Sequence, residues 1–212
     1  MKINMINGSQ KPGESNSGII LDSINELIKE EHEVRCFKFA INNFTDEMLK
    51  EAVSADVIVL AFPLFVDAIP SHTLKMLVEL ENTIKHERTD NLIIYTIINC
   101  GFFEGKQNLI AFEMIRHWCD HYGIQFGGGI GLGGGEMFGE VKNIPMNKGP
   151  FNNLARALQV MKESMELRKP FEIMYLNPCF PRFLFKFMAN RGWHSLAYKN
   201  GLKKKDLRRS SV

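Results

Sequence analysis

A polar loop rich in hydroxyl side chains lies near the start of the chain, between a short apolar segment and an amphipathic one. It reads NGSQKPGESNSG over residues 7 to 18, and no G-K-[ST] sequence closes it as in a P-loop. The amphipathic segment predicts a helix, whose first backbone N–H groups and positive dipole end favour an anion. An ordinary capped turn is the alternative. We expect a phosphate group here, near the donor side chains Ser9, Lys11, Ser15, Asn16 and Ser17.

A second loop, PLFVDAIPSHTLK, follows the third predicted strand and is apolar between two prolines. An apolar loop at the edge of a sheet, beside a ligand crevice, suits a flat aromatic ring better than a sugar. Packing against a second subunit is the other interpretation, and the two are compatible.

A third loop, NCGFFEG over residues 99 to 105, combines glycines with paired aromatic residues. The glycines allow the backbone to approach a ligand closely, and the aromatic rings could cover that ligand. Cys100 has no histidine nearby in the sequence, so we expect a buried, inert thiol rather than a nucleophile.

The run GGGIGLGGG at residues 127 to 135 contains G-x-G-x-x-G at Gly129, Gly131 and Gly134. A dinucleotide fingerprint follows the first strand of its unit and opens a helix at once. Here the run follows the fifth predicted strand, and prolines and glycines separate it from the next helix. We therefore interpret it as a flexible backbone edge beside the predicted ligand site, with Glu136 and Met137 shaping the opening.

Apolar periodicity predicts five strands alternating with five helices. The strands are expected at residues 2–7, 34–39, 56–63, 92–99 and from 124 into the glycine run, and the helices at 16–31, from 45, 71–84, 106–122 and 151–167. Asn16 or Ser17 is expected to cap the first helix, and Thr45 the second. This alternation predicts an α/β fold, a flavodoxin-like doubly wound parallel sheet in the order 2-1-3-4-5, built from right-handed crossovers.

We expect this domain to span residues 1–168 and a helical C-terminal extension to span residues 169–212. The extension is basic, with nine Lys or Arg against one acid from Pro181 onward, which leaves 17 basic and 23 acidic residues in the first 180. Its segment FPRFLFKFM places Phe183, Leu184, Phe187 and Met188 on one side of a helix. Peripheral membrane contact or nucleic-acid binding are possible uses, but packing on the acidic body or a sister subunit is favoured. Residues 203–212 are expected to be a solvated end.

The remaining composition favours a cytoplasmic protein. Four scattered cysteines form no C-x-x-C pair, and neither a secretory leader nor a membrane-spanning run is evident. His117 and His121, with Cys119 between them, lack the third ligand and the glutamate of a zinc motif, so we predict no metal site.

Three loops in this order resemble those of the flavodoxin-like NAD(P)H-dependent FMN reductases. NGSQKPGESNSG is similar to that family's G-S-x-[KR]-x-x-S-x-[ST] phosphate loop, and FPLFVDAIPSHTLKML to its second flavin loop. GFFEGKQN and the glycine run match its third loop and the end of its fifth strand in position. Gln10 departs from a common proline, and Phe65 from a frequent aromatic hydroxyl residue.

The resemblance implies FMN as cofactor, with the phosphate among the five donors of the first loop. The isoalloxazine ring would be lined by Pro63, Leu64, Phe65, Val66, Asn99, Cys100, Gly101 and Phe102. It implies an NAD(P)H oxidoreductase that passes a hydride through FMN to a small acceptor such as a quinone or flavin, as a homo-oligomer. No catalytic side chain is identified. The alternative is a flavodoxin-like FMN electron carrier without its own substrate turnover.

Overall fold

A computed structural model describes residues 1–39, 45–87, 91–137, 139, 144, 148–203 and 206 of the 212-residue chain. The chain divides into two compact units, Met1–Pro178 and Cys179–Val212. The sequence predicts this division after residue 168. The ten additional residues belong with the first unit because they contain a strand of its sheet.

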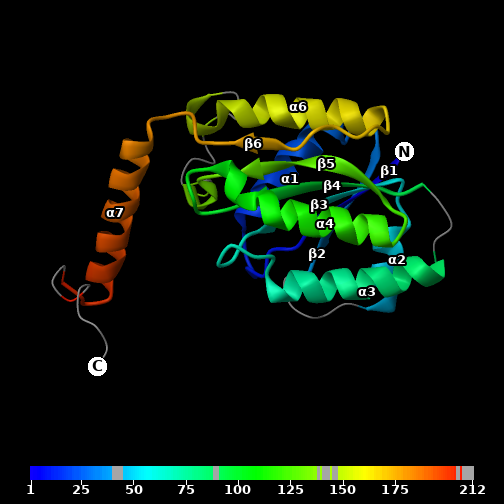
Figure 1. Ribbon diagram of the computed structural model, residues 1–212, viewed down its shortest axis with the longest axis horizontal. Helices are drawn as coiled ribbons and strands as arrows, with labels where there is room; N and C mark the ends of the chain where they lie inside the picture. Colours follow the sequence, from blue (N-terminus) through cyan, green and yellow to red (C-terminus); the bar gives the residue numbers. More distant parts are fainter. Residues whose placement is uncertain are drawn as a thin grey trace. The chain divides into compact units, whose positions relative to one another are not determined.

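The first unit is built on one parallel sheet of six strands in the order β2-β1-β3-β4-β5-β6 (Figure 1). The strands are β1 Lys2–Asn7, β2 Glu33–Lys38, β3 Val57–Pro63, β4 Ile93–Asn99, β5 Gln125–Leu132 and β6 Met174–Leu176. The first five follow the flavodoxin-like order, which confirms the predicted parallel α/β class. The predicted number of five strands was wrong, because β6 adds a sixth at the edge.

The added strand β6 is only three residues long, so its sequence is too short to show the alternation that predicts a strand. It pairs in parallel with β5, with Met174 opposite Ile130 and Leu176 opposite Leu132. Tertiary contacts with η1 (Gly105–Asn108) fix it further, because Asn177 Oδ1 accepts a hydrogen bond of 2.9 Å from the backbone N–H of Gly105.

Helices cover both faces of the sheet. Helices α1 (Asn16–Ile28) and α6 (Asn152–Glu166) pack on one face, while α2 (Asp46–Val53), α3 (Ser71–Glu87) and α4 (Leu109–His121) pack on the other. Two short 3₁₀ turns, η2 (Gly135–Met137) and η3 (Gly149–Phe151), lie between β5 and α6. Each face therefore has its own apolar core, and every residue of the central strand β4 is buried between them.

The crossover from β5 through α6 to β6 differs in hand from the others. Strand β2 lies on one side of β1 and β6 on the opposite side of β5, yet α1 and α6 cover the same face. Two crossovers that step in opposite directions over one face have opposite hands. Since β1–α1–β2 has the usual right hand, β5–α6–β6 is left-handed. Our expectation of uniformly right-handed crossovers does not hold for β6.

The capping residues of α1 and α2 show how the local sequence determines where a helix begins. Thr45 caps α2 as predicted, accepting a hydrogen bond of 3.2 Å from the N–H of Met48. The cap of α1 is Ser15, one residue before the expected Asn16 or Ser17, and its Oγ accepts the N–H of Gly18 at 3.1 Å. The helix then begins at Asn16 and leaves two N–H groups of its first turn without an intrahelical partner.

The second unit contains one long helix, α7 (Arg182–Lys199), as the sequence predicts. Of the expected solvated end at residues 203–212, only Lys203 and Asp206 are described. Across the described parts of both units, no helix combines the length and apolar character needed to cross a bilayer.

Candidate functional site

The loops expected to hold a ligand meet at one edge of the sheet. All strands are parallel, so the loops that follow β1, β3, β4 and β5 leave from the same side. Backbone contacts join them: the N–H of Gly8 bonds Ala61 O at 2.8 Å, and the N–H of Leu64 bonds Asn99 O at 2.8 Å. The sequence thus brings its three predicted loops to one place.

Asn7, the last residue of β1, organises the first loop from beneath. Its Oδ1 accepts the backbone N–H of Ser9 at 3.0 Å, and its Nδ2 donates to Ser15 Oγ at 3.1 Å. Lys38 closes the loop from the side, because its Nζ donates to the carbonyl oxygens of Pro12 and Gly13. Sequence reasoning missed both Asn7 and Lys38; for Asn7, a polar residue at the end of a buried strand was the available indication.

The start of α1 follows this loop directly and has backbone N–H groups without an intrahelical partner. Ser15 Oγ takes the N–H of Gly18, so the N–H groups of Asn16 and Ser17 are the ones that helix geometry leaves for a ligand. The Lys11 side chain is exposed, and Asn16 is half-buried. These are the donors and the positive charge that a phosphate needs.

A buried hydrogen bond connects the first loop to the end of β4. Ser17 Oγ donates to Asn99 Oδ1 at 2.8 Å, and both side chains are buried. The side chains of these two predicted site residues therefore bond to each other. Their side chains join the first loop to the third.

The carbonyl of Gly8 is held by two side chains from the start of α3. His72 Nε2 lies 2.6 Å from this oxygen, and Thr73 Oγ1 donates to it at 2.9 Å. Donation to a carbonyl requires a proton on Nε2, which fixes the tautomer of neutral His72. Neither residue was predicted as part of the site. Both orient the chain where it enters the first loop.

The second loop ends in a tight turn with unusual backbone angles. Phe65 and Ala68 exchange backbone hydrogen bonds of 3.0 and 3.1 Å, while Val66 and Asp67 between them have φ of 49° and 60°. Such a turn is normally made by Asn-Gly, and a β-branched residue is strained there. Val66 is nevertheless 99% exposed, and Phe65 is 44% exposed. The fold thus maintains two apolar side chains in solvent at this edge.

The third loop presents Phe102 outward and turns Cys100 inward. Phe102 is 47% exposed, whereas Cys100 is 2% exposed. The thiol lies near the carbonyl oxygens of Phe102 and Glu104 and accepts from Asn108 Nδ2 at 3.6 Å. Burial raises the pKa of the Cys100 thiol, so it stays protonated at neutral pH. The side chain of Cys100 supports the loop and is not a nucleophile.

Residues 127–132 of the glycine run lie in β5 and residues 133–135 follow it, and the run is closely packed, which corrects our interpretation of a flexible edge. A Cβ on Gly129 would lie 2.3 Å from the Phe112 ring and 2.5 Å from Thr96 O, and one on Gly133 would lie 2.1 Å from Phe103 O. The following N–H groups of Gly134 and Gly135 bond Phe102 O and Cys100 O at 2.5 and 2.7 Å. These glycines let the third loop lie directly on the end of β5.

The predicted site residues thus divide into two groups by exposure. The exposed residues are Lys11, Phe65, Val66, Gly101 and Phe102, and the half-buried ones are Asn16 and Pro63. The buried residues are Ser9, Ser15, Ser17, Leu64, Asn99 and Cys100. The exposed and half-buried residues form the surface of the candidate site, and the buried residues support it. Glu136 adjoins the surface, since a Cβ on Gly101 would lie 3.1 Å from its Oε1.

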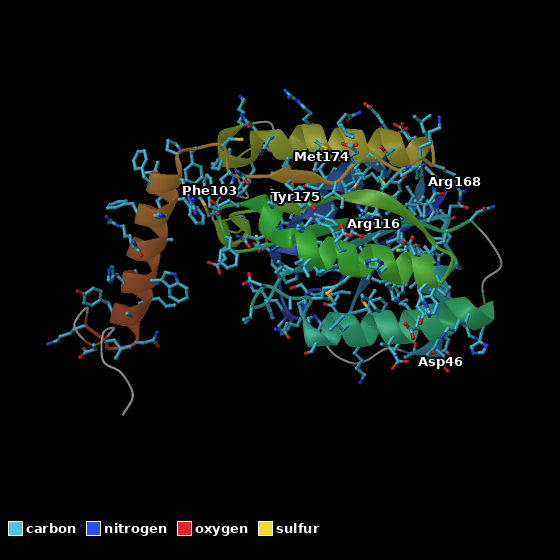
Figure 2. The ribbon with its side chains drawn as sticks, viewed as in Figure 1. Asp46, Phe103, Arg116, Arg168, Met174 and Tyr175 are labelled. Carbon is cyan, nitrogen blue, oxygen red and sulfur yellow. The ribbon has the colours of Figure 1, made fainter. Side chains whose placement is uncertain are left out.

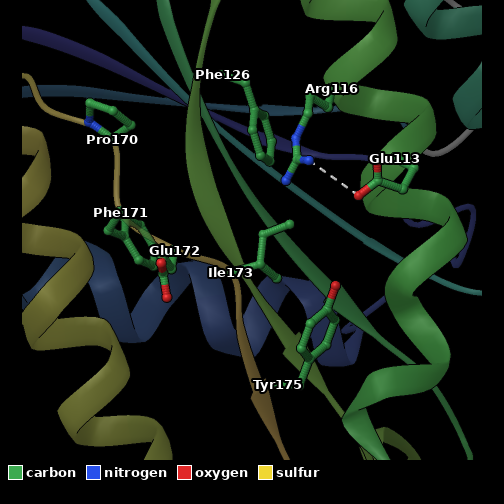
Figure 3. Close-up of a pocket in the computed structure, with 8 residues that line it drawn as sticks. All are labelled: Glu113, Arg116, Phe126, Pro170, Phe171, Glu172, Ile173 and Tyr175. Carbon is green, nitrogen blue, oxygen red and sulfur yellow. Dashed lines mark ion pairs between the residues drawn. The ribbon is translucent and has the colours of Figure 1, made fainter.

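A cavity of about 530 Å³ lies elsewhere, between α4 and the segment leading into β6 (Figure 3). Two of its charged groups pair with each other, because Arg116 Nη1 lies 3.3 Å from Glu113 Oε1, and the Arg116 guanidinium lies 5.6 Å from the Phe126 ring centroid. On the same helix, His117 and His121 are exposed while Cys119 is buried. These three side chains do not converge on one point.

Comparisons with known proteins support the fold. No family model matches the sequence, and no curated protein matches it. Among solved structures, an NADH:FMN oxidoreductase in its apo form has a TM-score of 0.59 at 12% identity, over 79% of this chain and 89% of its own.

Two further solved structures give similar values. The NADPH-quinone reductase from P. pentosaceus has a TM-score of 0.53 at 14% identity, over 76% of this chain and 97% of its own. The Trp repressor binding protein from Bacillus subtilis has a TM-score of 0.52 at 14% identity, over 62% and 84%. At such identities the likeness establishes a shared fold and leaves the reaction to be argued from the site.

Proposed function

We propose that this protein is an FMN-dependent NAD(P)H oxidoreductase. The observation that carries the proposal is the edge described above, where the start of α1 and several exposed apolar side chains lie at the same edge of the sheet. FMN has these two parts, a phosphate and a flat aromatic ring. Two of the three solved structures are named as an NADH:FMN oxidoreductase and an NADPH-quinone reductase, and these names support the same class of reaction.

The residues present fit the phosphate end of FMN. The N–H groups of Asn16 and Ser17 and the Asn16 amide can donate to phosphate oxygens, and Lys11 supplies a positive charge. Ser9 and Ser15 shape the loop through Asn7. No acidic residue occurs in the first turn of α1 to oppose an anion.

The residues present also fit the ring end. Phe65, Val66 and Phe102 offer apolar surface, and the backbone at Gly101 allows close approach. Bound FMN supplies the redox chemistry, by which a hydride from NAD(P)H reaches a small acceptor such as a quinone or flavin. The chain contributes position and exclusion of water on the buried side, and Cys100 takes no part because it stays protonated.

A titration of the protein with FMN tests the proposal. We expect the flavin absorbance to shift and its fluorescence to be quenched, and bound flavin to bleach anaerobically on addition of NADH or NADPH. No flavin binding at micromolar concentrations would refute the proposal. Binding without bleaching by either nucleotide would replace it with an electron carrier.

A single added charge tests the phosphate position. Asn16→Asp puts a carboxylate at the first residue of α1, which stabilises the helix by about 0.3–1 kcal/mol but repels a phosphate. At about 5 Å and an effective dielectric constant of about 20–80 the repulsion is about 1–3 kcal/mol per charge, so we expect roughly 5- to 100-fold weaker FMN binding. Asn152→Asp, the same change at the first residue of α6, is the matched control. Equal affinity of both variants for FMN would contradict the assignment.

A further inference from the structure

Helices α3 and α4 pack side by side on one face of the sheet, and the strip of surface between them is called the α3–α4 groove below (Figure 1). On α3, Leu74, Val78, Glu81 and Lys85 share one side of the helix at spacings of three and four. The last two contact the end of α4: Lys85 Nζ lies 4.8 Å from the Tyr122 ring centroid, and hydrogen bonding to Glu81 raises the pKa of Tyr122. This side of α3 therefore faces α4, and the groove is closed at that end.

The groove is open and apolar at its other end. On α4, Ile110, Met114 and Trp118 repeat every four residues, and Trp118 reaches Tyr122 with ring centroids 5.9 Å apart. Toward the helix starts no such contact closes the groove. There Leu74, Val78, Ile110 and Met114 are 38%, 49%, 61% and 41% exposed. Four large apolar side chains facing one groove are a surface for a partner helix.

Helix α7 has the complementary surface. Phe183, Leu184, Phe187 and Met188 are 74%, 39%, 63% and 43% exposed, and their spacing places them on one side of the helix. Side chains stand on every side of α7 (Figure 2). Among the described residues of its unit only Ala197 is buried. Most helical stability in proteins comes from tertiary packing of an apolar face, so the exposed apolar side of α7 requires cover.

We propose that α7 of a second copy of this chain docks in the α3–α4 groove, with Phe183, Leu184, Phe187 and Met188 against Leu74, Val78, Ile110 and Met114. The inference stands apart from the proposed redox function. The charges agree with it: residues 1–180 carry 23 acids against 17 bases, and the remainder carries nine bases against one acid. Two bodies of like charge repel each other, and an exchanged basic tail between them removes that repulsion.

The second half of α7 favours exchange between two copies over cover by one body. Nine residues, or two and a half turns, separate Leu184 from Trp193 and Phe187 from Leu196. Trp193 and Leu196, 64% and 52% exposed, therefore lie on the side opposite to the groove-binding residues. One groove cannot cover both sides. In a symmetric dimer, the second chain provides another surface that can cover Trp193 and Leu196.

Disulfide trapping between two differently labelled chains tests the pairing. In a background with Cys36→Ser and Cys179→Ser, which removes the exposed thiols, one chain carries Ile110→Cys and the other Phe187→Cys. We expect a mixed disulfide between the chains on oxidation. Leu167→Cys, also exposed but at the end of α6, replaces Ile110→Cys in the control and should give no product. A disulfide that forms only when both cysteines are in one chain would overturn the proposal.

The mass in solution provides the second readout. Light scattering of the wild-type protein should give a mass of twice 24.3 kDa. Ile110→Lys should raise the dissociation constant of the dimer at least about tenfold. Leu167→Lys is the control, and circular dichroism confirms that each variant is folded. A monomeric wild-type chain, or a dimer unaffected by Ile110→Lys, contradicts the proposal. A monomer that pellets through its tail with phosphatidylserine vesicles would assign α7 to lipid instead.

Discussion

Gly129 in the middle of β5 is where a single methyl group should do the most damage. A Cβ there would lie 2.3 Å from Phe112 Cε1 and 2.5 Å from the carbonyl oxygen of Thr96, about 1 Å closer than ordinary contact. Neither atom can easily move. Phe112 is fully buried with its ring against Tyr175, and Thr96 is the register partner of Gly129 in β4.

We therefore expect Gly129→Ala to lower the free energy of unfolding by about 3 kcal/mol or more. With a urea dependence of about 2–3 kcal/mol per molar, the unfolding midpoint should fall by about 1–1.5 M. The melting temperature should fall by about 6–12 °C. Equilibrium unfolding followed by circular dichroism measures both changes.

Gly13→Ala is the matched control, because nothing lies within 4 Å of a Cβ at Gly13 and its φ is not left-handed. It should change stability by less than about 0.5 kcal/mol, or slightly raise it. Adding Phe112→Leu to Gly129→Ala should restore part of the loss, since it removes the ring and leaves the carbonyl contact. If Gly129→Ala unfolds at the same urea concentration as Gly13→Ala, close packing is not the reason for the glycine run.

Three further changes test other parts of the fold. Burial raises the pKa of Tyr95 to about 12. The unfolded chain loses this proton first, above about pH 10, so the free energy of unfolding should fall by up to about 2 kcal/mol between about pH 10 and 12. The urea midpoint of the Tyr95→Phe variant should not show this fall. Ser17→Ala leaves Asn99 Oδ1 buried without its donor and should cost about 1–3 kcal/mol; unchanged unfolding would show that the bond contributes nothing. Val66→Asn relieves the left-handed backbone and should add about 1 kcal/mol; an unchanged melting temperature would show that the backbone at Val66 is not strained.

The fold class was predictable because its information is local. The apolar runs of β3 and β4 are continuous, as buried parallel strands require, and they appear directly in the sequence at residues 57–63 and 93–99. The polar loop before α1 and the apolar loop before α3 were recognised for the same reason. Once parallel strands alternate with helices, the loops at their carboxyl ends meet at one edge without further information.

The supporting contacts of the site were not predictable, because they join residues far apart in the chain. The pair Ser17–Asn99 spans 82 residues, and His72 reaches Gly8 across 64. Each residue alone has no pattern that distinguishes it from an ordinary polar side chain. Sequence reasoning therefore identified which loops meet at one edge of the sheet, but not which of their side chains are exposed there and which hold the loops together.

By itself, the sequence determined a parallel α/β domain, a hydroxyl-rich helix start suited to phosphate, and a basic helical tail. Only the tertiary structure decided the sixth strand, the left-handed crossover that reaches it, and the role of GGGIGLGGG. The physical reason is the same in each case. A three-residue strand and a glycine are specified by the atoms packed against them, here Gly105, Phe112 and Thr96, and those atoms lie elsewhere in the sequence.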